Sequence, residues 1–208
     1  MFLTGLFSNP LLFVFYIAIL VIIISVHEFA HAYMADRLGD PTPELAGRLT
    51  LNPKAHLVPL GSILFLLFGF GWGRPVPFDP YNLRNPRKDA ALISLAGPAS
   101  NLIMALGASL VLYLFNFSGT SEISSIGYSI LVLYIRLNII LGVFNLLPFA
   151  PLDGFKIVGG FLNDNQAHDW YGLERYGMLF LIFLYFPLPE KNLCLIYWIQ
   201  LYVKANRL

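Results

Sequence analysis

Long apolar runs, separated by short polar stretches, organise this chain. The first run covers residues 10–38, and no charged side chain occurs in it between Pro10 and Val26. An α-helix rises about 1.5 Å per residue, so this run is long enough to cross the roughly 30 Å hydrocarbon core of a membrane. Residues 90–115 and 126–147 are two further runs of spanning length. The pattern therefore predicts three membrane-spanning helices.

The remaining apolar runs are shorter or contain helix breakers. Residues 57–70 include Pro59 and Gly61 and are too few for a spanning helix. Basic residues flank this run on both sides, and a full crossing would place one basic loop outside, against the positive-inside rule. We therefore expect residues 57–70 to enter the membrane and return on the same side. Residues 170–187 form a fifth run, and the short run 193–203 either crosses or lies in the interface.

Together these runs predict an all-α polytopic membrane bundle of about five to six apolar segments, one of them re-entrant. Residues 73–78 alternate proline with other residues, which predicts a short extended or β element near the cytoplasmic face. The loop at 116–125 carries no Lys or Arg, so we expect it and the N-terminus outside and the basic loops in the cytoplasm. We expect residues 1–208 to form a single membrane-embedded domain, multi-pass in the cell membrane.

Composition supports a membrane protein and narrows its partners. Apolar residues make up 57% of the 208 residues and charged residues 12%, about half the charged fraction of an average soluble domain. The net charge is +1, and no basic block points to a nucleic-acid partner. The single cysteine, Cys194, excludes an internal disulfide and a zinc site built on cysteines.

The most specific chemical signal is an H-E-x-x-H motif formed by His27, Glu28 and His31 at the end of the first apolar run. Residues four apart share one face of a helix, so both imidazoles can ligate one Zn²⁺. Glu28 lies beside that face and can reach a metal-bound water without being a ligand. Because ionisable groups at membrane depth are costly, their presence there indicates a functional site.

A catalytic zinc site needs a third protein ligand and an open fourth position. Asp153 is the favoured candidate, because it follows a helix end unwound by prolines and lies on the same predicted side of the membrane as the motif. His56 is the alternative. His168 and Glu174 are less favoured, since His168 lies in the polar stretch 163–169. We expect one Zn²⁺ per chain, with Glu28 as the catalytic base.

Three further polar residues are candidate contacts to the oxyanion or the substrate. They are Asn145, His56 and Asn101. Each has a simpler alternative role. Asn145 can cap the unwound backbone, Asn101 can make a hydrogen bond between packed helices, and His56 can be a surface histidine.

Four motifs occur in an order that is typical of one known family. They are the H-E-x-x-H motif at 27–31, NPKAH at 52–56, AGPASN at 96–101, and NLLPFAPLDG at 145–154. On these motifs, residues 18–160 resemble the site-2 protease family of intramembrane zinc metalloproteases, in its compact prokaryotic branch without a PDZ or CBS domain. The C-terminal segments at 170–205 carry no family motif.

The resemblance implies zinc held by His27, His31 and Asp153, with Asn145 near the oxyanion or the substrate backbone. It implies hydrolysis of peptide bonds within or near transmembrane helices of membrane-tethered proteins, as in regulated intramembrane proteolysis. Such a helix must unwind before an amide can be attacked. We hypothesise that residues 73–78 pair with the unwound strand, so that proline at Val76 or Phe78 impairs cleavage while zinc is kept.

Two other functions remain open from the sequence. A catalytically silent adaptor that binds transmembrane helices would be expected to have lost Glu28 or a ligand, and neither is lost. A divalent-metal carrier would need polar groups along a path through the bundle, and the runs 90–115 and 126–147 offer few. The sequence therefore favours a membrane-embedded zinc endopeptidase.

Overall fold

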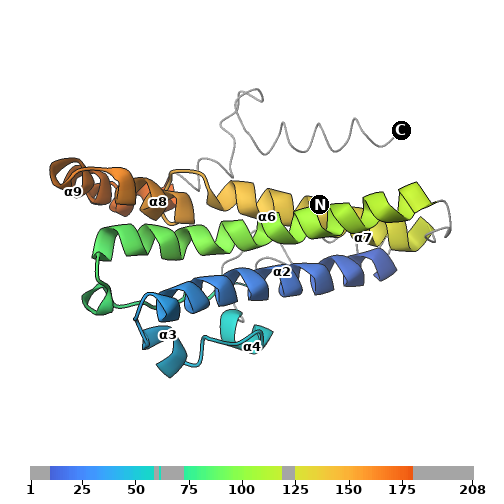
Figure 1. Cartoon of the computed structure of the whole chain (residues 1–208), viewed down its shortest axis with the longest axis horizontal. Helices are drawn as coiled ribbons and strands as arrows, with labels where there is room; N and C mark the ends of the chain where they lie inside the picture. Colours follow the sequence, from blue (N-terminus) through green and yellow to red (C-terminus); the bar gives the residue numbers. More distant parts are fainter. Residues whose placement is uncertain (1–9, 59–60, 62–72, 119–124, 180–208) are drawn as a thin grey trace.

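The computed structural model describes residues 10–58, 61, 73–118 and 125–179. Its long helices lie side by side along one axis, with the short helices gathered towards one end (Figure 1). The interior of the predicted re-entrant run, the run 193–203 and residues 180–187 of the fifth run lie outside the described residues. The predicted number of apolar segments therefore stays a prediction.

Three helices are long and apolar enough to cross a membrane: α2 (Pro10–Arg37), α6 (Pro86–Ser118) and α7 (Ser125–Asn145). They coincide with the three predicted spanning runs. Helix α6 starts four positions earlier than the apolar run, because the Asp89 carboxylate accepts a hydrogen bond from Asn85 N at 2.8 Å and caps a charged first turn.

Helix α6 is the centre of the bundle and contacts α2, α7 and α8. Apolar packing joins α2 to α7 through Ile19, Ile23 and Leu137. A second buried cluster joins the end of α2 to α6 and to the segment between α4 and α6. Its residues are Ala35, Leu83 and Ile93, with Met34, Leu38 and Phe78 packed against them.

The polar stretch after α2 contains two short helices, α3 (Thr42–Leu45) and α4 (Pro53–His56). Pro43 and Pro53 occupy the first turns of these helices, where proline's missing N–H costs nothing. A 3₁₀ turn, η1 (Pro80–Asn82), precedes α6.

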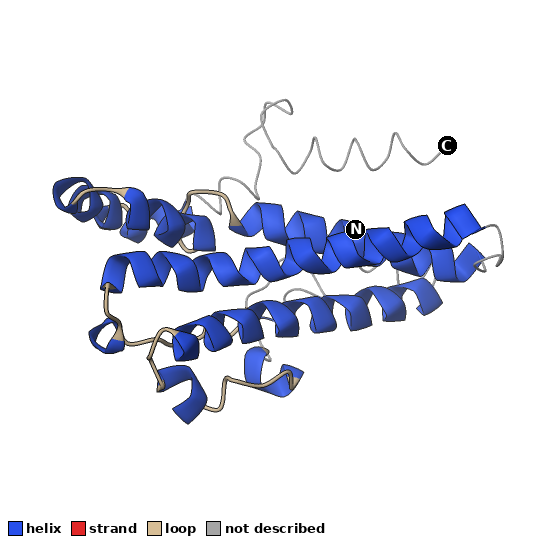
Figure 2. Ribbon diagram, in the orientation of Figure 1, coloured by secondary structure: helices blue, strands red, loops and turns tan. Residues whose placement is uncertain are grey.

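In the part of the chain that the structure describes, helices and loops account for the fold and no sheet forms (Figure 2). One isolated antiparallel bridge joins Leu57 to Gly73, and Arg74 N donates to His56 O at 2.8 Å. The two flanks of the predicted re-entrant run are thus paired with each other. Residues 74–79 have no regular secondary structure, so the predicted extended element is reduced here to this single bridge.

After α7 the chain turns and re-enters a helix at the predicted third ligand. Helix α8 (Asp153–Phe161) runs along α6, and α9 (Asp164–Gly172) follows, with a second 3₁₀ turn at η2 (Glu174–Tyr176). The fifth apolar run was predicted to begin at Trp170. That residue lies inside α9, whose start is fixed earlier by a capping box between Asn163 and Gln166.

Candidate metal centre

The structure brings His27, His31 and Asp153 together although they come from two helices far apart in sequence. The Asp153 Oδ2 atom lies 3.2 Å from His27 Nε2 and 3.3 Å from His31 Nε2. The two Nε2 atoms are 3.1 Å apart. Three potential ligand atoms therefore form a nearly equilateral triangle, the arrangement that H-E-x-x-H and an aspartate were predicted to make.

The triangle has the size that a zinc ion requires. Ligands about 2.0–2.2 Å from a tetrahedral Zn²⁺ lie roughly 3.3–3.6 Å from one another, close to the three distances observed. The residues present therefore fit a zinc ion with two imidazoles and one carboxylate as ligands, the donor set of many catalytic zinc sites.

Hydrogen bonds on the far side of each imidazole fix which nitrogen faces the triangle. His31 Nδ1 lies 2.7 Å from Ile93 O. A carbonyl oxygen only accepts, so Nδ1 carries the proton and Nε2 of the neutral ring presents a lone pair to the site. A backbone carbonyl of α6 thereby holds His31 in the tautomer that binds a metal.

His27 is oriented by a relay that ends on a second backbone carbonyl. Asn138 Nδ2 donates to Tyr134 O at 2.9 Å, which turns Asn138 Oδ1 towards Asn101. Asn101 Nδ2 donates to that oxygen at 3.1 Å, so Asn101 Oδ1 accepts from His27 Nδ1 at 2.6 Å. The Tyr134 carbonyl thus sets the direction of every hydrogen bond in the relay and leaves Nε2 of His27 unprotonated.

The convergence of three acceptors is the strongest sign of a cation site. With both histidines neutral, no hydrogen lies between the two Nε2 lone pairs and the Asp153 carboxylate. Three buried acceptors that face one another repel unless a cation lies between them. A metal ion satisfies all three at once.

Gly97 allows both imidazoles to lie against α6. A Cβ added at this position would lie 2.7 Å from His27 Cε1 and closer still to the His31 ring, distances that real Cβ atoms essentially never show. The AGPASN motif therefore has a physical reason at two positions: Gly97 makes room for the histidines, and Asn101 holds one of them.

Asp153 is held by a different set of contacts, at the start of a short helix. A Cβ at Gly154 would collide with the backbone carbonyls of Leu146 and Leu147, so glycine lets α8 begin directly against the end of α7. Burial alone raises the pKa of Asp153, whereas positive charge on the two neighbouring histidines would lower it below its ordinary value. With both imidazoles neutral, a bound cation would supply that positive charge and keep the carboxylate ionised.

Glu28 lies next to the ligand triangle, half-buried on α2. Glu28 interacts electrostatically with Arg48, a 3% exposed side chain. Burial lowers the pKa of Arg48 and the charge of Arg74 lowers it further, while the charge of Glu28 opposes both. Arg48 also donates to Ala55 O at 2.6 Å and to Arg74 O, so it joins the two paired flanks of the predicted re-entrant run near Glu28.

The other predicted candidates lie in different places. His56 is fully buried and its Nε2 donates to Thr50 O at 2.7 Å, so it is not a surface histidine. Asn145 Nδ2 donates to Leu141 O at 3.0 Å within its own helix. Neither is part of the metal-ligating group, and neither is His168 or Glu174. The roles of Asn145 and His56 towards substrate stay predictions.

Two residues near the site, Asn138 and Arg48, were not among the candidates predicted from the sequence. Asn138 is fully buried in a helix whose neighbouring residues are mostly apolar, and a buried polar side chain in such a helix is itself a functional signal. The polar side chain of Asn138 within this apolar helix could therefore have identified it as a candidate from the sequence. No sequence signal links Arg48 to Glu28, because their proximity depends on how the loop after α2 folds back.

The helices and the site define a membrane-associated metal-binding protein of the H-E-x-x-H class. A Bacillus subtilis protein named "Putative zinc metalloprotease YwhC" is 39% identical over 173 residues, which cover 81% of this chain and 79% of that protein. The chain belongs to this site-2 protease-like family of zinc metalloproteases.

Other relatives agree with this assignment. "Putative zinc metalloprotease Rip2" of Mycolicibacterium smegmatis is 30% identical over 83% of this chain and 68% of its own length. "Zinc metalloprotease MJ0392" of Methanocaldococcus jannaschii is 24% identical over 91% of this chain, which spans about half of that protein, 47%. No family model matches the chain, and no solved structure matches it significantly.

Proposed function

We propose that this protein is an intramembrane zinc metalloendopeptidase that hydrolyses peptide bonds within or near transmembrane helices of membrane-tethered proteins. The observation that carries the proposal is the ligand triangle of His27, His31 and Asp153 inside a bundle of apolar helices. A soluble zinc peptidase has no need to place its ligands there, whereas a protease of transmembrane helices does.

The position of the site along α6 supports cleavage at membrane depth. Gly97, which touches both imidazoles, is eight residues beyond Asp89, the last charged residue of α6 before its apolar stretch. At about 1.5 Å per residue the ligands lie roughly 12 Å inward from that charged end. We place this end on the cytoplasmic side of the cell membrane, because Arg84, Arg87 and Lys88 lie beside it and the positive-inside rule favours basic loops on that side.

The residues present divide the work of peptide hydrolysis among them. When bound, zinc would lower the pKa of a coordinated water and polarise the scissile carbonyl. Glu28 is positioned to take a proton from the attacking water and to pass it to the leaving amine. His27 and His31 hold their lone pairs towards the site through the Asn101 relay and the Ile93 carbonyl. Asn145 is the candidate donor to the oxyanion.

Pairing of the substrate with residues 73–78 is part of the same proposal. The Leu57–Gly73 bridge places the start of this segment beside α4. Phe78 packs into a buried cluster, so a proline there would also disturb folding. Val76 is the cleaner position for the test. Val76→Pro is expected to reduce cleavage while zinc content and thermal stability stay at the wild-type level, and unchanged cleavage would remove the pairing step.

The decisive experiment compares the purified wild type with Glu28→Gln. Both are assayed for zinc and incubated with a set of synthetic transmembrane peptides in detergent micelles. Equal zinc content, with cleavage only by the wild type, is the expected result. General-base catalysis contributes about 10²–10⁴-fold, so the loss is expected in that range. Equal cleavage by both proteins would remove Glu28 from the mechanism.

Two further measurements separate the alternatives. A catalytically silent adaptor would bind the peptides, and neither the wild type nor Glu28→Gln would cleave them. A divalent-metal carrier reconstituted into sealed vesicles would move zinc across the membrane, and again neither form would cleave the peptides. The intact Glu28 and the complete ligand set favour the protease.

A further inference from the structure

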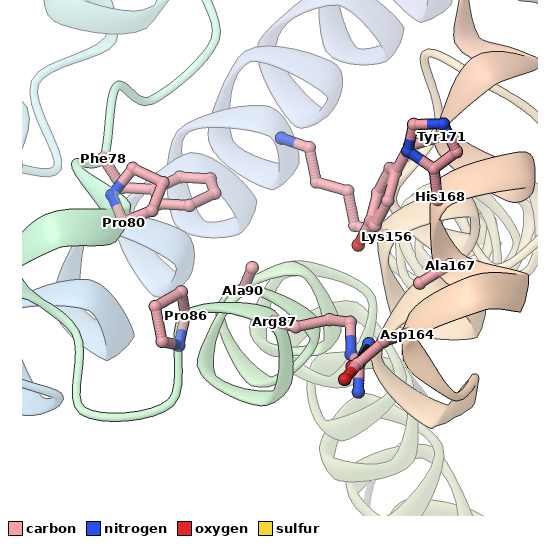
Figure 3. Close-up of a pocket in the computed structure, with 10 residues that line it drawn as sticks. All are labelled: Phe78, Pro80, Pro86, Arg87, Ala90, Lys156, Asp164, Ala167, His168 and Tyr171. Atoms are coloured by element: carbon pink, nitrogen blue, oxygen red, sulfur yellow. Dashed lines mark hydrogen bonds and ion pairs between the residues drawn. The ribbon is translucent and has the colours of Figure 1, made fainter.

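A second site lies at the charged end of the bundle, away from the metal ligands. It is an open cavity of about 510 Å³ between the first turn of α6, helices α8 and α9, and the segment before η1. Figure 3 shows Phe78 on one side of it, Tyr171 on the other, and Lys156 extending between them. Most of its lining atoms are apolar.

The cations of this cavity are not fully neutralised. Arg87 pairs with Asp164 at 2.6 Å, but its Nε atom is buried and has no hydrogen-bond partner. Lys156 Nζ lies 4.9 Å from the centre of the Phe78 ring, and in the described part of the chain no carboxylate pairs with it. The cavity therefore offers the Lys156 ammonium, which lies over the Phe78 ring, and the partly exposed guanidinium of Arg87, which is paired with the exposed Asp164.

The cavity lies at the level where a membrane helix meets the headgroups. Pro86, Arg87 and Ala90 of its lining belong to the first turns of α6. Beyond Asp89 that helix carries no charged side chain up to residue 118. Charged residues that directly precede a long apolar helix lie in the interfacial region, where phosphate groups of the lipids are found.

We propose that this cavity binds the headgroup of an anionic phospholipid. The phosphate would lie between the Lys156 ammonium and the guanidinium of Arg87, and the glycerol and upper acyl carbons would contact the apolar walls. Basic pockets between transmembrane helices commonly bind anionic headgroups in this way. A soluble anion would contact the two cations but would leave the apolar walls uncovered. An acidic peptide would have to displace lipid to reach the cavity at the depth of the headgroups.

The cavity is connected to the metal centre through α8 and through the buried cluster at the end of α2. Lys156 is one helical turn after Asp153 on α8. Phe78 packs against the cluster that includes Ile93, whose carbonyl holds His31. A headgroup that bridges Lys156 and Arg87 would hold α8 against α6 and keep Asp153 beside the histidines. This effect on activity rests on the function proposed above, whereas the binding does not.

Binding is tested on the zinc-loaded Glu28→Gln protein, so that its outcome does not depend on proteolysis. The protein is placed in nanodiscs of phosphatidylcholine with or without phosphatidylglycerol, and retained lipid is counted by native mass spectrometry. Lys156→Gln is the test variant and Lys156→Arg the conservative rescue. Lys88→Gln is the matched control, because Lys88 is an exposed cation on the same turn as Arg87 but does not line the cavity.

We expect retained phosphatidylglycerol in the parent protein, in Lys156→Arg and in Lys88→Gln. Loss of one charge-assisted hydrogen bond should weaken retention in Lys156→Gln roughly ten-fold or more. An exposed basic residue contributes no more than about five-fold near an anionic surface. Equal losses in Lys156→Gln and Lys88→Gln would overturn the site, as would equal retention of both lipids by the parent. Displacement by soluble glycerol phosphate would overturn the assignment to a lipid.

The regulatory step is tested separately with active protein in the same two kinds of nanodisc. Phosphatidylglycerol should raise peptide cleavage by the wild type and by Lys88→Gln, but not by Lys156→Gln. Lipid retention without any change in cleavage by an active wild type would overturn the link to Asp153. Lipid retention by a wild type that cleaves nothing in either lipid would instead count against the proposed protease function and leave the lipid site standing.

Discussion

The histidine half and the carboxylate half of the metal centre are built in different ways. His27 and His31 lie on a helix of 28 residues, and each is anchored through a hydrogen bond that leads to a backbone carbonyl of α6 or α7. Asp153 is the first residue of a helix of nine residues that follows an irregular turn. The histidines are therefore set by the bundle itself, whereas the aspartate depends on how α8 docks onto it.

The two halves of the site therefore differ in what can disturb them. A preorganised pair of imidazoles stays in place as long as the three long helices are packed together. The third ligand depends in addition on α8, which packs along α6 with Gly154, Phe155, Gly159 and Gly160 buried. We therefore expect substitutions in this packing to displace Asp153 while the histidine pair stays in place.

The largest expected effect comes from filling the space beside the ligands. In Gly97→Ala the new Cβ would collide with both imidazoles, so we expect no bound zinc and no measurable cleavage. In Gly154→Ala the collision is with the end of α7, so Asp153 should move while the histidines stay. Weak residual zinc binding is expected there, measured by atomic absorption after dialysis.

Gly107→Ala is the matched control on α6, because nothing lies within 4 Å of a Cβ at that position. It should keep wild-type zinc and activity. Equal zinc loss in Gly97→Ala and Gly154→Ala would show that the two halves are not independent.

A smaller effect is expected from breaking the relay behind His27. Asn138→Leu removes the acceptor for Asn101 Nδ2 and frees Asn101 to rotate. Loss of such outer contacts typically costs 10–100-fold in metal affinity, and we expect zinc affinity to fall by about that factor. Competition with a fluorescent chelator measures it. Ser109→Ala, which removes a hydroxyl bonded only to its own helix, should leave zinc affinity unchanged; a parallel loss there would point to general loosening of α6.

The smallest effect on the metal centre is expected from Asp40, which stabilises the loop after α2. Its carboxylate accepts hydrogen bonds from Asp79 N at 2.7 Å and from the side chains of Asn82 and Thr42. Replacing it with alanine removes the acceptor of these partly buried donors and should lower the free energy of unfolding by about 1 kcal/mol. Zinc content at neutral pH should not change, since Asp40 touches no ligand.

The contribution of Asp40 should also depend on pH. Burial would raise the pKa of Asp40, but the hydrogen bonds it accepts outweigh this and lower the pKa below its ordinary 3.8. Its stabilisation is therefore complete above that value and is lost as the pH falls through the lower, folded-state pKa. Thermal unfolding with a chelator present should show wild type and Asp40→Asn converging only in strong acid. Convergence already near neutral pH would contradict this assignment.

The sequence predicted the parts of the molecule that depend on local pattern. Apolar runs located α2, α6 and α7, and the loop charges placed Asp153 on the same side as His27 and His31. The sequence did not predict contacts between residues that are far apart in the chain. His27 and Asn101 are 74 positions apart, so the sequence alone left Asn101 open between a packing contact and a substrate contact. The α8–α9 hairpin was missed because short helices rely on docking rather than on a long periodic pattern.

The unequal exposure of the three ligands has a consequence for chemical inhibition. The side chains of His27 and His31 are 6% and 9% exposed, whereas that of Asp153 is 19% exposed. The metal position is therefore shielded by α2 and α6 and is open mainly beside α8. A chelating inhibitor would have to enter along the Asp153 side. The groups attached to its zinc-binding moiety would therefore contact α8 first. Selectivity between this protein and soluble H-E-x-x-H peptidases is best sought in the part of the drug that lies against that short helix.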